Sequence, residues 1–166
     1  MYNQINRIKD KLQKKNIKLS NVVDKKKIRE FEMRNNIKLP NEIVEFYTLI
    51  SNGCEMIDGF YLYSFEEWKY NADRISNSFP YEKYFVWEDE NDIEETMYNL
   101  LDNGNIELID IGDSQTWNII VSGNQYGKMW FFSDVGIQPA APEKHFLDWF
   151  EYWLDGNEDY FKDFIC

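Results

Sequence analysis

The chain has 166 residues, of which 43% are hydrophobic, 17% aromatic and 29% charged. This length suits one domain, and the apolar content is sufficient for one core. Only two cysteines occur, Cys54 and Cys166, and neither has a cysteine or histidine at metal-ligand spacing, so neither a disulfide framework nor a zinc site is supported. No stretch has the apolar length of a secretory signal or a membrane span, which predicts a cytoplasmic protein without a membrane partner.

The net charge of −12 is distributed unevenly along the chain. Residues 1–38 hold 12 basic and 4 acidic side chains, whereas the other 128 residues hold 6 basic and 26 acidic ones. An acidic body repels phosphate backbones and attracts cationic surfaces. It predicts a basic protein partner and no direct nucleic-acid contact, although many domains are acidic for solubility alone.

Two short basic helices are predicted before residue 37. The first extends to about residue 16 and has Ile5, Ile8 and Leu12 at helical spacing. The second follows Asp24 as N-cap and ends at Asn35-Asn36, a pair that tolerates the left-handed conformation. The phrase Asn-Ile-Lys-Leu-x-Asn, present at 16–21 and 36–41, is interpreted as two similar helix entries. Residues 1–23 are expected to form a basic helical extension and residues 24–166 the domain.

A third helix is predicted within residues 37–56. Pro40 suits the first helical position, and Glu42 lies near the positive end of the helix dipole. Asn52-Gly53 then supplies residues that can take positive φ where the helix ends. One face has apolar residues at i, i+3, i+4 and i+7, and these are Ile43, Phe46, Tyr47 and Ile50. The expected role of this helix is packing in the core.

The remaining elements are mixed. Residues 59–64 have the composition of a strand, 65–77 of a helix, 79–87 of a strand, and 88–105 of an acidic stretch that runs into a short helix. Three antiparallel strands are predicted at 106–112, 117–123 and 128–134, with glycines in the hairpin loop at 122–127. A last helix carries Phe146, Trp149, Phe150 and Trp153 and ends at Asp155-Gly156. The predicted fold is α+β: a single domain with N-terminal helices and a C-terminal helix packed on a mainly antiparallel β-sheet.

No catalytic constellation is visible. His145 is the only histidine and has no partner at a recognisable spacing. Residues 121–127 match neither a nucleophile elbow nor a phosphate-binding loop. The acidic stretch 88–95 lacks the glycine and the spacing of a calcium loop. We therefore expect a protein that is not an enzyme, with no catalytic, cofactor-binding or metal-binding residue.

The order of several short motifs resembles the SUKH superfamily, which includes fungal cell-wall-synthesis regulators and bacterial toxin-immunity proteins. The N-terminal part of the resemblance consists of Ile28, Phe31-Glu32, Asn36-Ile37, Leu39-Pro40, Glu42, Phe46 and Asn52-Gly53. Ser-Phe-Glu-Glu-Trp at 64–68, Ile-Gly-Asp-Ser at 111–114 and Phe-Leu-Asp-Trp-Phe-Glu at 146–151 follow in the same order, so the likeness covers roughly residues 24–155. Phe31, Leu39, Pro40, Phe46, Asn52 and Gly53 are expected to be structural.

The resemblance implies a non-catalytic binding domain, similar to immunity proteins that block a cognate toxin. Many such toxins are nucleases, which hold phosphate with Lys and Arg, so an acidic inhibitor suits them. The alternative is a regulatory or scaffold module that binds a cellular partner without a toxin. A likeness at the level of the fold does not choose between them.

The acidic stretch 88–95 departs from the usual pattern of the superfamily and is the predicted partner surface. It offers Glu88, Asp89, Glu90, Asp92, Glu94 and Glu95 for steering. Trp87, directly before it, is a candidate anchor, although packing of Trp87 in the core competes with that role. If the stretch is only solvated, the partner surface is expected on the sheet around Asp113 and Trp117.

Overall fold

The computed structural model describes residues 2–56, 58–86, 95–134, 136–139 and 143–156. Its elements are α1 (Tyr2–Lys14), α2 (Lys25–Asn35), α3 (Asn41–Leu49), β1 (Cys54–Glu55), β2 (Tyr61–Leu62), β3 (Phe85–Val86), α4 (Glu95–Leu101), β4 (Asn105–Gly112), β5 (Gln115–Ile120), β6 (Met129–Ser133), β7 (Gly136–Pro139) and α5 (Phe146–Leu154). One turn of 3-10 helix, Phe65–Glu67, follows β2. The protein is a single α+β domain, as the sequence predicts.

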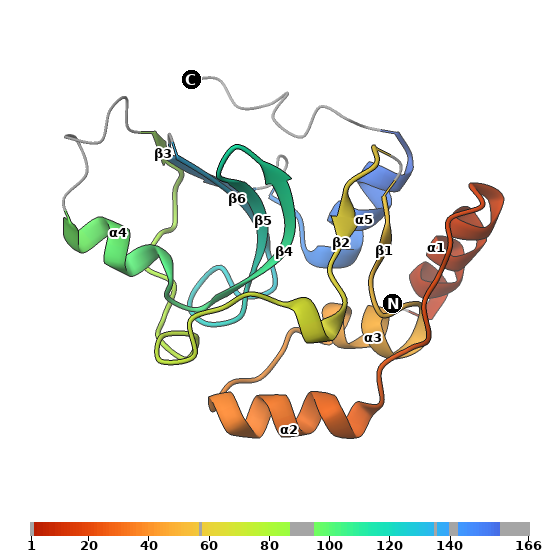
Figure 1. Ribbon diagram of the computed structural model, residues 1–166, viewed down its shortest axis with the longest axis horizontal. Coiled ribbons are helices and arrows are strands. Elements are labelled where there is room, and N and C mark those ends of the chain that lie inside the picture. The colour runs from red at the N-terminus through yellow and green to blue at the C-terminus, as the bar shows by residue number, and fades with distance from the viewer. Residues whose placement is uncertain (1, 57, 87–94, 135, 140–142, 157–166) are drawn as a thin grey trace.

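The main sheet is antiparallel, with its strands in the order β3-β7-β6-β5-β4. β4, β5 and β6 are the three predicted strands, whereas β7, which joins β6 to the short β3, was not predicted. Figure 1 shows α5 and the small β1–β2 sheet on one side of the main sheet and α4 on the other. Both faces of the central strands are therefore covered.

The main core lies between the sheet and the helices α3 and α5. Phe46 of α3 is fully buried, and its ring centroid is 4.7 Å from that of Phe150 and 5.4 Å from that of Phe146, both on α5. On the sheet side, Trp117 lies 5.3 Å from Trp149 of α5, centroid to centroid. The predicted apolar faces of both helices are confirmed, because every one of their predicted residues is buried.

The N-terminal helix α1 contributes to this same core. Its apolar residues Ile5, Ile8 and Leu12 are at most 2% exposed and belong to the main cluster. α1 packs beside α5 and α3, at the right edge of Figure 1. The segment expected to be an extension is therefore physically part of the folded body.

The repeated phrase Asn-Ile-Lys-Leu marks two helix ends. Asn16 and Asn36 both take left-handed φ values, 55° and 51°. In each repeat the isoleucine N–H bonds to a carbonyl five residues back, 3.1 Å from Ile17 to Leu12 and 3.1 Å from Ile37 to Glu32. This is the Schellman motif, in which asparagine replaces the usual glycine. Each repeat also precedes the next helix, α2 from Lys25 or α3 from Asn41, so the expected helix entries lie directly after these helix ends.

The helix predicted at 65–77 is largely absent. Only Phe65–Glu67 form a 3-10 turn, which starts with a capping box in which Glu67 accepts the Ser64 N–H at 3.0 Å. It ends there because Trp68 is extended and the Lys69 carbonyl accepts the N–H of Glu107 on β4 at 2.9 Å. Asn71 then accepts the N–H of Asp73 at 3.1 Å, a local bond that competes with helix formation. Trp68 and Ile75 are nevertheless buried, at 6% and 0% exposure.

The face of the sheet opposite α5 has two parts. A small apolar cluster of Phe79, Ile120, Trp130 and Ile137 fills one part. Beside it, towards β4, the strands carry polar side chains that face α4 and the segment 69–71. This polar part forms a cleft, which the next section describes.

Candidate binding surface

Exposed aspartates gather at one end of the main sheet. Asp113 lies with Ser114 in a two-residue turn between β4 and β5, where both take positive φ as in a type I′ hairpin. The turn from β6 to β7 starts at the same end, because Thr116 pairs with Phe132 and Ser133 pairs with Gly136. Exposed Asp134 lies in that turn, and exposed Asp110 lies near the end of β4.

The strand that precedes the predicted partner surface ends at this same place. Val86 closes β3, pairs with Gly136 and is 48% exposed. The chain continues directly from Val86 into residues 87–94, which lie outside the described residues. Trp87, Glu88, Asp89, Glu90, Asp92 and Glu94 are in that gap, and Glu95 begins α4. The predicted acidic stretch therefore starts at the end of the sheet that carries Asp113.

Trp117, the other residue predicted around Asp113, is in the core. It is 4% exposed and packs on Phe131, with centroids 5.2 Å apart, and on Trp149. β5 is a central strand, and the face of it that carries Trp117 and Ile119 belongs to the main core under α5. The Trp117 ring is therefore not accessible to a partner in this conformation, and Trp117 is not part of the proposed surface.

A cleft of about 540 Å³ lies on the α4 side of the sheet. Its floor comes from Asn105 and Glu107 of β4, Thr116 and Asn118 of β5, and Phe132 of β6. One wall holds Lys69, whose Nζ is 2.8 Å from Glu107 Oε1 and 3.5 Å from Asp110 Oδ2. The hydrogen bond to Glu107 raises the pKa of Lys69, so this lysine stays charged and neutralises part of the cleft's negative charge.

Two buried asparagines form the floor of the cleft, and their amide orientations follow from their partners. Asn105 lies 2.6 Å from the carbonyl oxygen of Leu101 and 3.0 Å from that of Asn103, so the atom facing both must be the donor Nδ2. Oδ1 of Asn105 then accepts from Nδ2 of Asn118 at 3.3 Å. Oδ1 of Asn118 is left without a partner among the described residues.

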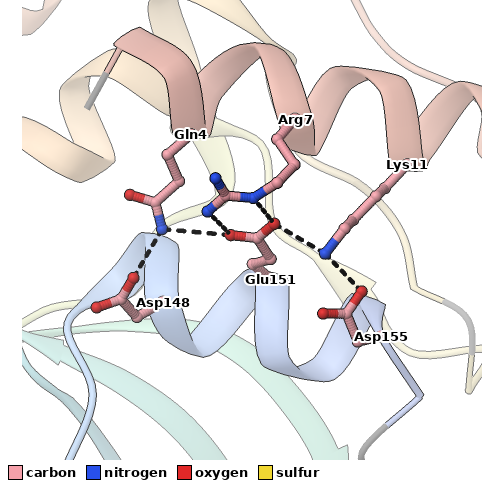
Figure 2. Close-up of polar contacts among 6 residues, drawn as sticks. All are labelled: Gln4, Arg7, Lys11, Asp148, Glu151 and Asp155. Atoms are coloured by element: carbon pink, nitrogen blue, oxygen red, sulfur yellow. Dashed lines mark hydrogen bonds and ion pairs between the residues drawn. The ribbon is translucent and has the colours of Figure 1, made fainter.

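A polar network joins α1 to α5 (Figure 2). Glu151 accepts two hydrogen bonds from the Arg7 guanidinium, and Lys11 Nζ lies 2.8 Å from the same carboxylate and 2.6 Å from Asp155. The hydrogen bond from Arg7 lowers the pKa of Glu151 to about 2. These two basic residues of the N-terminal part are therefore neutralised by carboxylates of α5 and its C-cap.

The residues expected to be structural lie in the core or in its turns. Phe31 meets Phe65, Trp68 and Tyr70 edge to face, and Leu39 and Phe46 are fully buried. Pro40 is the N-cap of α3, one position before the one predicted. Asn52 accepts the N–H of Phe65 at 2.7 Å and donates to Glu66 at 2.8 Å. Gly53 has φ +75°.

Metal-binding side chains do not gather in the described part of the chain. No three His, Cys, Asp or Glu side chains there are placed to hold a metal ion. Burial raises the pKa of Cys54 to about 12, so its thiol is inert near neutral pH. Across the same residues, no helix has both the length and the apolar character needed to cross a bilayer.

Comparison with known proteins places the chain in a family. The model of the SMI1 / KNR4 family (SUKH-1) matches residues 23–156, more than half of the chain. No curated protein and no solved structure matches it. Members of this family are generally non-catalytic, and membership supports a protein-binding role of the immunity or regulatory kind. The chain belongs to the SMI1 / KNR4 family (SUKH-1).

Proposed function

We propose that this protein is an immunity protein, which binds and neutralises a cognate bacterial toxin in the cytoplasm without catalysis. The toxin surface that it meets is basic, as in a nuclease domain. The observation that carries the proposal is the acidic end of the sheet, where Asp113 and Asp134 are exposed beside the point at which β3 leads into residues 87–95.

Charge complementarity explains how such a surface acts. Residues 87–95 contain six carboxylates, and the turn aspartates at the end of the sheet extend the same sign of charge. Exposed charges of one sign attract an oppositely charged partner over about a Debye length and raise the association rate. A nuclease whose phosphate-binding cations are covered in this way loses contact with its nucleic acid.

The basic N-terminal helices do not cancel this field. Arg7 and Lys11 are paired with α5, and Lys27 is paired with Glu66 at 2.9 Å. α1 and α2 lie at the right and at the bottom of Figure 1, whereas β3 and the turn after β4 lie at the top. The acidic end of the sheet is thus separated from the basic helices.

Affinity requires more than steering, because exposed charges chiefly set the association rate. Trp87 precedes the six carboxylates, and tryptophan is enriched among residues that dominate binding energy. Trp87→Ala is therefore expected to increase the dissociation rate of the complex while leaving its association rate nearly unchanged.

The experiment pairs this protein with any toxin-like C-terminal domain that a neighbouring reading frame encodes. Cells that express the toxin domain should stop growing, and co-expression of this protein should restore growth. The purified pair should elute together in size-exclusion chromatography. A toxin domain that still arrests growth and elutes separately contradicts the proposal, as does the lack of any such neighbouring reading frame, which favours a regulatory partner.

A further inference from the structure

The geometry of the cleft between β4, β5 and α4 points to a binding site for one arginine side chain of a protein partner. This inference rests on the proposed function for the identity of the partner, a basic protein. The chemistry of the cleft is independent of the proposed function, because it follows from the described residues.

The floor of the cleft requires a ligand that donates hydrogen bonds. Asn118 is 3% exposed, and its amide orientation is fixed because its Nδ2 donates to Asn105. Its Oδ1 is buried with no partner among the described residues, and an unmet buried acceptor costs about 1–3 kcal/mol. Asn118 lines the cleft, so the cleft is the side from which we infer that a ligand's donor reaches this oxygen.

The charge around the cleft excludes anions and favours a cation. Lys69 is the only base among the described residues that line it, and Glu107 and Asp110 already pair with that lysine. Asp102 at the rim adds another carboxylate, which accepts from Asn71 at 2.9 Å. Carboxylates thus outnumber cations, so a phosphate or carboxylate ligand is repelled and a cationic group is attracted.

The shape and the aromatic walls favour guanidinium over ammonium. Phe132 on β6 and Tyr70 on the opposite segment line the same cleft. A planar guanidinium stacks on aromatic rings and presents five donors, enough to reach the Asn118 amide and a rim carboxylate together. A lysine ammonium offers a point charge that fits this arrangement less well.

The cleft also lies close to the acidic end of the sheet. Thr116 on its floor is two residues from the turn at Ser114, and Asp110 contributes to both features. A basic partner steered to Asp113 therefore has the cleft within reach of one side chain. Buried arginines are among the residues that dominate binding energy in protein interfaces.

The test is a titration of the full ¹⁵N-labelled chain with Nα-acetyl-arginine amide, followed by NMR. The side-chain amide signals of Asn105 and Asn118 should shift and saturate in the millimolar range, as expected for a fragment. Nα-acetyl-citrulline amide, which has nearly the same shape without the charge, should bind at least tenfold more weakly. Equal shifts with citrulline or with the lysine analogue, or no saturation at these signals, overturn the inference.

Two variants locate the site. Asn118→Leu removes the acceptor at nearly constant volume and should weaken arginine binding about tenfold. Because this substitution is buried, Asp102→Asn at the exposed rim serves as a second variant, with an expected loss of about threefold; it keeps the acceptor for Asn71. Asp73→Asn, on the same segment but outside the cleft lining, is the matched control and should leave binding unchanged. Unchanged affinity in both cleft variants contradicts the assignment.

The titration needs no toxin, so its outcome is separate from that of the proposed function. Saturable arginine binding together with no complex in the toxin experiment supports the arginine site in the cleft and contradicts the proposed immunity function. A toxin complex whose affinity is unchanged by Asp102→Asn, together with no arginine binding, supports the proposed immunity function and contradicts the arginine site in the cleft.

Discussion

The guanidinium of Arg7 in α1 donates two hydrogen bonds to the carboxylate of Glu151 in α5, with Nη2 2.6 Å from Oε2. Lys11 adds an ion pair to the same carboxylate (Figure 2). Glu151 is only 8% exposed, so its charge needs these partners. The contact ties a helix that lies before the family match at residue 23 to the last described helix of the domain.

Glu151→Gln is predicted to destabilise the protein at neutral pH and to flatten its acid dependence. The pKa of Glu151 is about 2 in the folded protein, below the ordinary 4.5, because its charged form is bonded to Arg7. The charged carboxylate therefore contributes stability above pH 4.5, and this contribution is lost as the pH falls towards 2. Because Arg7 is half-exposed, solvent screens this interaction, and the expected loss in the free energy of unfolding is about 1–3 kcal/mol.

Urea unfolding at pH 7 and pH 3 measures this difference. Asp148→Asn is the control, because Asp148 lies on the same helix, is exposed and accepts a single bond from Gln4 at 2.7 Å. It should cost less than about 0.5 kcal/mol. Equal losses in the two variants, or a Glu151→Gln loss that persists unchanged at pH 3, contradict the account of the network.

Phe46→Ala is predicted to lower the free energy of unfolding by about 3–5 kcal/mol. The ring is fully buried against Phe146 and Phe150, so its removal leaves a cavity between α3 and α5. Leu49→Ala on the same helix, at a residue 40% exposed, is the control and should cost far less. Similar denaturation midpoints for the two variants count against the packing described here.

Gly53→Ala is predicted to destabilise the protein more than Gly59→Ala. Both glycines have positive φ, +75° and +87°, which costs an L-residue about 1–2 kcal/mol. A Cβ at Gly53 also lies 2.5 Å from the Leu62 carbonyl oxygen, whereas nothing is within 4 Å at Gly59. Thermal unfolding of the two variants separates backbone strain from steric overlap, and a smaller loss at Gly53 is the contrary result.

Local patterns in the sequence predict the helices well because their causes are local. Periodic apolar residues identify α1, α3 and α5, and Asp24 and Asn36 mark the ends of α2 through bonds to neighbouring backbone. The helix at 65–77 ends after Glu67 because Trp68 is extended and the Lys69 carbonyl accepts the N–H of Glu107 on β4 at 2.9 Å. Helical periodicity carries no information about that distant contact.

Contacts between distant segments are what the sequence does not predict. Glu42, expected to act on its own helix, accepts the N–H of Leu147 at 2.8 Å and so caps α5 instead. Trp117 is in the core because α5 packs on that face of β5, with Trp149 5.3 Å away between ring centroids, a contact between distant segments. The cleft has one sequence signal, the asparagines Asn105 and Asn118 within apolar strands, but its acceptor exists only after β4 and β5 pair.

Association kinetics with the neighbouring toxin domain test the central claim, that the acidic end of the sheet steers the partner. The test variant is Glu90→Lys, Asp92→Lys and Asp113→Lys together. Its control reverses the same number of carboxylates elsewhere, Asp10→Lys, Glu30→Lys and Glu82→Lys, so both have a net charge of −6 in place of −12. At low salt the test variant should associate about tenfold more slowly than the wild type, and the difference should shrink as salt is added. The control should change the rate far less, and equal slowing in the two folded variants, or none in either, contradicts the claim.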